Sequence, residues 1–138
     1  MKSLPLLLAL FSGGAAATSL DDQFGHSVSL DTPHRQIFFA ADMAAGKLVY
    51  KAFGQAKDDK MKNAGVLYVA DISAMPGFVA KLFAKPKMRK YPYRMLLDEK
   101  GQVTADWPRQ DDAVTIIEGN KHWFCKDVSC LQKALVQP

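Results

Sequence analysis

The strongest constraint on the fold is a continuous apolar run, Ile37 to Ala41, that ends directly at Asp42. Such a run suits a strand that is buried on both faces, as in the parallel centre of an α/β sheet. Asp42 is a residue type that caps helix N-termini. Apolar residues then recur at helical spacing to about Gln55. The segment therefore predicts a central strand that passes straight into an amphipathic helix.

The first seventeen residues have the pattern of a secretory signal peptide. Lys2 precedes a short apolar run, 4–11, and the alanines at 15–17 offer a small-residue cleavage site. The run is too short to span a bilayer, and no later segment is long enough for a membrane helix. We expect cleavage after Ala17, and we expect residues 18–138 to form one domain in the periplasm or outside the cell.

Further strands and helices alternate along the rest of the chain. A second helix is expected to begin between Ser73 and Pro76, with Pro86 ending it, and its apolar face is formed by Phe78, Val79, Leu82 and Phe83. The segment 103–107 fits either a short helix or a strand. Strands are expected at 24–30 (around a turn at Gly25), 66–70, 93–98, 114–118 and 122–125, and a last helix at 128–136. Helical crossovers make the first three long strands parallel, and the Gly119-Asn120 turn makes the last two antiparallel.

Four stretches in this order resemble the TlpA-like and peroxiredoxin-like branch of the thioredoxin superfamily: 22–30, 38–40, 93–103 and 115–121. The resemblance covers nearly the whole of residues 22–135. It implies an α/β fold, a three-layer α/β/α sandwich whose mixed central sheet has three parallel strands and a C-terminal antiparallel hairpin.

The departures from this family concern its chemistry. The family carries two redox cysteines at the start of the helix after the first central strand, where this chain has Met43 and Gly46. A methionine has no ionisable proton and cannot attack a disulfide. The cis-proline position before the last hairpin holds Asp111-Asp112-Ala113, and the chain contains no Thr-x-x-Cys motif for peroxidase chemistry. The resemblance therefore implies a scaffold that has lost its usual active site.

Cys125 and Cys130 are the two cysteines of the chain. In an oxidising compartment such a pair predicts one disulfide, stabilising by about 2 kcal/mol because the loop it closes is short. A redox-active pair is the alternative, since Cys130 lies near the start of the last predicted helix and Lys126 lies beside Cys125. A metal site that adds His122 is disfavoured, because strand positions three apart face opposite sides; we expect no metal and no cofactor.

Three acids, Asp42, Asp71 and Asp98, each follow a predicted parallel strand. Ligands gather at the carboxyl ends of such strands, but Asp also caps helices and turns at these places. Asp42 is the most interesting of the three, because it lies at the rim of the lost redox site. We take Asp42, Met43 and Asp112 as a candidate binding pocket.

The segment from Lys81 to Arg94 carries six cations and no acid, with aromatic residues between them. Its alternatives are a solvated helix end or a surface for an acidic protein, an anionic lipid layer or a polyanion. Export makes nucleic acid an improbable partner. The candidate surface for an anionic partner consists of Lys85, Lys87, Arg89, Lys90 and Arg94.

Two functions remain. The first is an exported, redox-degenerate module that binds an unidentified protein or small ligand without catalysis. The second is a thiol-disulfide oxidoreductase that uses the Cys125/Cys130 pair. No phosphate-binding loop or hydrolase motif occurs in the chain.

Overall fold

The computed structural model describes residues 18–136, so the expected signal peptide, residues 1–17, lies outside the described part. The elements within this part are β1 (Ser19–Asp22), β2 (Ser27–Ser29), β3 (Gln36–Ala40), α2 (Met43–Phe53), α3 (Lys60–Asn63), β4 (Val66–Asp71), α4 (Gly77–Val79), the π-helical turn η1 (Ala80–Ala84), α5 (Lys85–Met88), β5 (Leu96–Asp98), β6 (Val114–Glu118), β7 (Lys121–Cys125) and α6 (Val128–Val136). None of these helices has the length and apolar content that crossing a membrane requires.

Within residues 18–136, seven strands form one mixed sheet in the order β2-β1-β5-β4-β3-β6-β7. Strands β3, β4 and β5 are parallel, and every other neighbouring pair is antiparallel. The apolar run forms β3 at the centre, where Phe38 lies between Tyr68 of β4 and Ile116 of β6. The predicted fold class is thus confirmed: an α/β fold with parallel core strands and a C-terminal antiparallel hairpin. The N-terminal hairpin begins earlier than expected and turns at Gly25, whose φ of 84° suits glycine.

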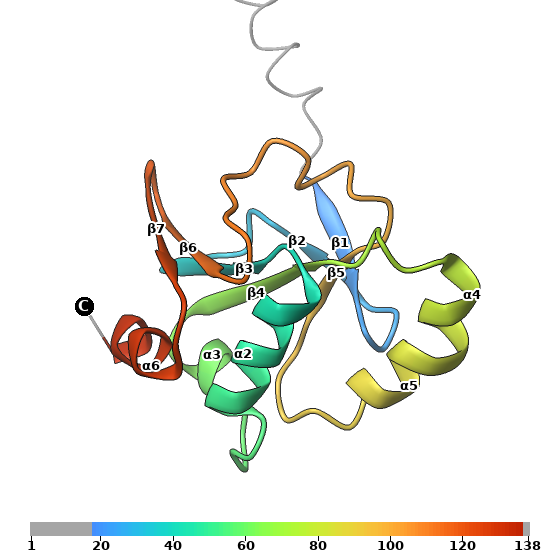
Figure 1. Ribbon diagram of the computed structural model, residues 1–138, viewed down its shortest axis with the longest axis horizontal. Helices are drawn as coiled ribbons and strands as arrows, with labels where there is room; N and C mark the ends of the chain where they lie inside the picture. Colours follow the sequence, from blue (N-terminus) through green and yellow to red (C-terminus); the bar gives the residue numbers. More distant parts are fainter. Residues whose placement is uncertain (1–17, 137–138) are drawn as a thin grey trace, which may run out of the picture.

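The two faces of the sheet are covered differently (Figure 1). Phe38 points into the larger core cluster, which contains the buried residues of α2, η1, α5 and α6. Phe39 points the other way, into a smaller cluster built only from strand and loop residues. The helices of the described part therefore pack on one face. A loop, in place of the second helical layer that a three-layer sandwich would have, covers the other face of the sheet in residues 18–136.

That loop, residues 99–113, is fixed by three side chains. The buried carboxylate of Asp98 accepts hydrogen bonds from Gly101 N (3.0 Å), Thr104 N (2.8 Å) and Thr104 Oγ1 (2.8 Å). The Trp107 ring packs edge-on against Phe39, with 5.1 Å between ring centroids. The expectation of a helix or strand at 103–107 is wrong, because these side chains hold the backbone in successive turns.

The helix after β4 continues past Pro86, which was expected to end it. Gly77 to Met88 is helical without a break, with a π-helical turn, η1, immediately before Pro86. Lys85 N–H donates to Ala80 O across this wider turn. Proline breaks an α-helix by removing one hydrogen bond and crowding the preceding turn, and an irregular turn at this point accommodates both effects.

Candidate functional site

Asp42 organises the rim at the start of α2, formed by Asp42, Met43 and Asp112, where the family resemblance implies a redox site. Its Oδ1 accepts a hydrogen bond from Ala45 N (2.8 Å) and so caps α2. Its Oδ2 accepts from Asp112 N (3.0 Å), in the loop that precedes β6. Asp112 has a φ of 59°, a left-handed conformation that Asp tolerates better than most residues. Asp42, Met43 and Asp112 thus lie close to one another at the start of α2.

The first turn of α2 offers no group that could act as a nucleophile. Met43 is the first residue of α2, and its side chain is 69% exposed. At Gly46, an added Cβ would meet only Tyr68 Oη, at 3.9 Å. Burial, with a smaller effect of Tyr91, raises the pKa of Tyr68, so its phenol stays protonated. The rim therefore presents two carboxylates, those of Asp42 and Asp112, and the apolar side chain of Met43, with no thiol.

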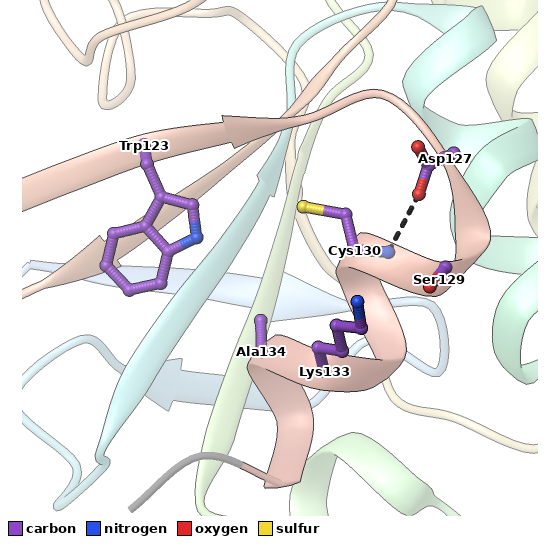
Figure 2. Close-up of a pocket in the computed structure, with 6 residues that line it drawn as sticks. All are labelled: Trp123, Asp127, Ser129, Cys130, Lys133 and Ala134. Carbon is purple, nitrogen blue, oxygen red and sulfur yellow. Dashed lines mark hydrogen bonds between the residues drawn. The ribbon is translucent and has the colours of Figure 1, made fainter.

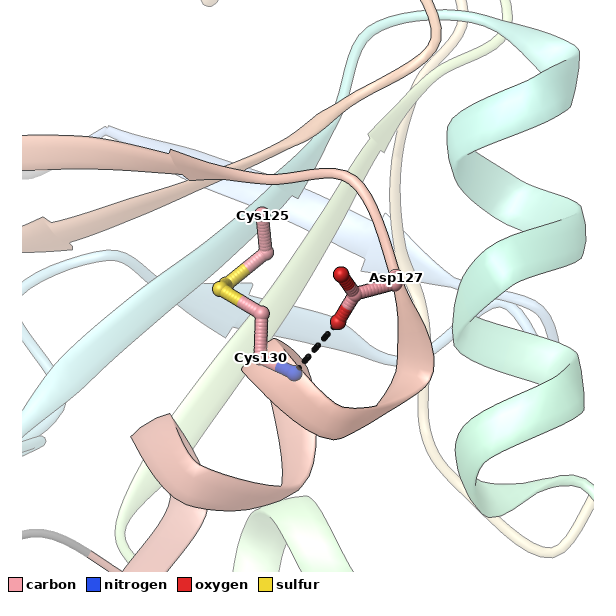
Figure 3. The surroundings of a disulfide bond; sticks show 3 residues. All are labelled: Cys125, Asp127 and Cys130. Atoms are coloured by element: carbon pink, nitrogen blue, oxygen red, sulfur yellow. Dashed lines mark hydrogen bonds between the residues drawn. A yellow bond between two sulfur atoms is a disulfide. The ribbon is translucent and has the colours of Figure 1, made fainter.

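The two cysteines lie elsewhere. Cys125 ends β7 and is fully buried, and it forms a disulfide with Cys130 in the first turn of α6 (Figure 3). Asp127 Oδ1 accepts from Cys130 N (2.8 Å) and caps this helix.

A shallow hollow of about 370 Å³ opens beside the disulfide. Figure 2 shows the Trp123 indole of β7 on one side and the first turns of α6 on the other. The hollow is lined by Trp123, Asp127, Ser129, Cys130, Lys133 and Ala134. Sequence patterns do not indicate this hollow, because its side chains come from β7 and α6, two elements whose packing against each other such patterns do not specify. Asp42, Met43 and Asp112 line neither this hollow nor the one between β1 and the loop after β5.

The other two strand-end acids serve the local backbone. Asp71 accepts from Ser73 N (2.9 Å) and from Arg109 Nη1 (3.1 Å). Burial alone would raise the pKa of Asp71, but the hydrogen bonds from Ser73 and the Arg109 guanidinium outweigh it and lower the pKa. Asp98 is occupied by the turn of the covering loop. The turn-forming role that the sequence allowed is therefore the one that Asp71 and Asp98 have.

The cations of the candidate basic surface differ in their surroundings. Lys85 Nζ forms an ion pair with Glu99 (2.9 Å), and Arg89 Nε donates to Gln23 O (3.1 Å). Arg94 is partly buried, and its backbone N–H donates to Asp59 Oδ2 (2.9 Å). Lys87 and Lys90 are exposed, with no acidic side chain of residues 18–136 within ion-pair distance. In the same described part of the chain, no group of three or more His, Cys, Asp or Glu residues is placed to hold a metal ion.

Solved structures with a similar fold were found by structural comparison. StoA from Bacillus subtilis superposes with a TM-score of 0.54 over 86% of this chain and 95% of its own, at 13% identity. The pneumococcal exposed lipoprotein thioredoxin Etrx1 from Streptococcus pneumoniae gives 0.54 over 87% and 98%, at 19% identity. A putative thioredoxin from Neisseria meningitidis gives 0.53 over 88% and 86%, at 20% identity. The fold of this chain is therefore thioredoxin-like. No protein-family model matches the chain, and no curated protein matches it by sequence.

Proposed function

We propose that this protein is an exported, redox-inactive module of the thioredoxin fold that binds a protein or small ligand. One observation carries the proposal: Met43 and Gly46 begin α2 where the resemblance implies the redox thiols, while both cysteines of the chain are joined between β7 and α6. A scaffold that keeps the helix start and its rim without a nucleophile retains a surface for binding.

The rim supplies contacts suited to recognition. Asp42 is held by two backbone N–H donors on opposite sides of the rim, so its carboxylate is fixed in place. Met43 stands beside it with most of its side chain in solvent, and methionine adapts readily to apolar partners. A ligand with an apolar group and a hydrogen-bond donor fits this pair.

Export is supported by the signal-peptide pattern of residues 1–17 and by the disulfide, which persists in oxidising compartments. The similarity to an exposed lipoprotein thioredoxin agrees with this. We propose the periplasm or the extracellular space as the location.

The test combines a redox arm and a binding arm on the chain from Thr18. Redox titration with mass-shift alkylation should give a reduction potential below about −300 mV for the cysteine pair, with no turnover of a disulfide substrate. In the binding arm, Met43→Asp should lose ligands captured from the exported fraction, whereas Gln132→Asp on exposed α6 should keep them. A potential near −200 mV or higher with turnover would establish an oxidoreductase that uses Cys125 and Cys130. Unchanged capture by Met43→Asp would remove the rim as the binding site.

A further inference from the structure

The helix from Gly77 to Met88 carries its large apolar side chains on the outside. Phe78, Leu82 and Phe83 are 66%, 62% and 66% exposed, whereas the residues that the helix buries are Ala80 and Met88. The spacing of Phe78, Val79, Leu82 and Phe83 predicts the apolar face of an amphipathic helix, which ordinarily packs on a core. Here that face points to solvent, and exposed apolar clusters mark interaction surfaces.

This orientation is fixed by the rest of the fold. Gln23 is buried, and its Nε2 donates to Met88 O (3.2 Å) and to Tyr93 O (2.8 Å). The Arg89 guanidinium bonds back to the Gln23 carbonyl, and Lys85 pairs with Glu99 beyond β5. Rotating the helix to bury its phenylalanines would break these contacts. Figure 1 shows α4 and α5 at the opposite side of the molecule from α6.

Cations flank the exposed apolar residues. Lys81, Lys87 and Lys90 are exposed, and no acidic side chain of the described residues lies within ion-pair distance of them. Glu99 is occupied by Lys85. The side of the helix that faces solvent therefore carries exposed apolar side chains between Phe78 and Phe83. Exposed lysines lie within this stretch, at Lys81, and beyond it, at Lys87 and Lys90, in a chain whose isoelectric point is about 9.1.

We propose that this surface, formed by Phe78, Lys81, Leu82, Phe83, Lys87 and Lys90, binds an anionic lipid layer. Helices that lie in a membrane interface insert aromatic and aliphatic side chains among the acyl chains, with lysines contacting anionic headgroups. The helix is about 18 Å long, long enough to lie flat on the layer. The protein then attaches peripherally, with no segment of the domain crossing the bilayer.

Two observations favour lipid over other occupants. A second copy of the same surface would bring the flanking lysines of both copies together, which is unfavourable without acids between them. Phe78, Leu82 and Phe83 each have about two thirds of their surface exposed. A partner protein would therefore need a deep groove to bury them, with acidic side chains to pair with the lysines. A fluid interface accepts protruding side chains without such a groove. None of the rim residues belongs to this surface, so the failure of either proposal leaves the other intact.

The test is co-sedimentation of the chain from Thr18, which contains every described strand and helix, with vesicles of phosphatidylglycerol and phosphatidylcholine. Phe78→Ser/Leu82→Ser/Phe83→Ser should lower the partition coefficient at least ~10-fold, because the inserted apolar surface is lost. Lys81→Gln/Lys87→Gln/Lys90→Gln should lower it about 100-fold at low salt. Added salt should weaken the wild type and affect the lysine variant less.

Matched controls keep the comparison specific. Val136→Ser removes an apolar side chain that is 78% exposed on α6, and Lys47→Gln/Lys51→Gln/Lys57→Gln removes three exposed cations near α2. Val136→Ser should bind like the wild type, and the second lysine triple should lose far less than the first. Circular dichroism melts establish that every variant is folded. No wild-type binding to anionic vesicles, equal binding to pure phosphatidylcholine, or equal losses in the variants and their controls would overturn the proposal. A concentration-dependent dimer that the serine triple abolishes would assign the surface to a second copy instead.

Discussion

The starts of α2 and α6 are built alike and differ in what they hold. At each, an aspartate Oδ1 accepts from the backbone N–H three residues later at 2.8 Å: Asp42 from Ala45 and Asp127 from Cys130. At α2 the other carboxylate oxygen reaches across to Asp112 N in a separate loop. At α6 the first turn is instead linked covalently to the preceding strand through Cys125.

Capping of a helix start does not depend on the presence of a cysteine there. Both helix starts have the cap and the positive end of the helix dipole, which favour negative charge. The start that follows a central parallel strand has no sulfur nucleophile. The start that follows the edge strand has its sulfurs consumed in a disulfide, one of them fully buried. A capped helix N-terminus therefore occurs in this fold both with and without a cysteine, and the disulfide belongs to the helix that follows the edge strand β7.

The largest expected effect comes from placing thiols at the start of α2. Met43→Cys/Gly46→Cys should form a second disulfide and acquire measurable disulfide-exchange turnover, because Gly46 has room for a side chain and Met43 is exposed. Turnover of a disulfide peptide under a thiol reductant measures this, with Met43→Cys alone as the control. A double variant that forms its disulfide and still shows no exchange would mean that this rim lacks the geometry of a redox site.

Removing the Cys125–Cys130 disulfide should have an intermediate effect, on stability. Cys125→Ser/Cys130→Ser should lower the free energy of unfolding by about 2 kcal/mol, as expected for so short a closed loop. Urea denaturation with and without reductant measures the loss, and reductant should change the wild type but not the variant. Binding through the rim should stay the same, and a loss of binding would show that the two helix starts are coupled.

The smallest expected effect is the difference in stability loss between removing the cap of α6, Asp127, and removing the cap of α2, Asp42. Asp127→Ala should cost about 1 kcal/mol of stability through the lost cap. Asp42→Ala should cost about 1 kcal/mol more, because it also removes the hydrogen bond that Asp112 N donates. Urea midpoints of both variants test the difference, and Asp42→Asn should recover part of it. Equal losses would indicate that the Asp42–Asp112 contact contributes no stability.

The sequence predicted most accurately those features that depend on neighbouring residues. The apolar run gave the central strand, Asp42 gave the start of α2, and Gly119-Asn120 gave the final hairpin, since each signal lies within a few residues of its element. The loop that covers the second face was missed. Its shape depends on Asp98 and Trp107, whose partners are set by the path of the whole loop.

The helix from Gly77 to Met88 shows where local patterns stop being sufficient. Its amphipathic spacing was visible, but the spacing does not say which face meets the core. The buried side chain of Gln23 holds the end of the helix and the segment after it in place. It does so through hydrogen bonds to Met88, Tyr93 and Met95, which lie 65 to 72 positions away in the sequence. The same holds for the rim: the family resemblance groups Asp42 with Asp112, and the hydrogen bond between them is a property of the folded chain.

By itself the sequence determined the sheet, its parallel centre and the absence of a thiol at the start of α2, because strand patterning and residue identity are local properties. Tertiary structure alone decided which apolar residues remain in solvent and which cations keep no acidic partner. Exposure and ion pairing are properties of the packed chain, set by contacts between segments that no sequence window contains.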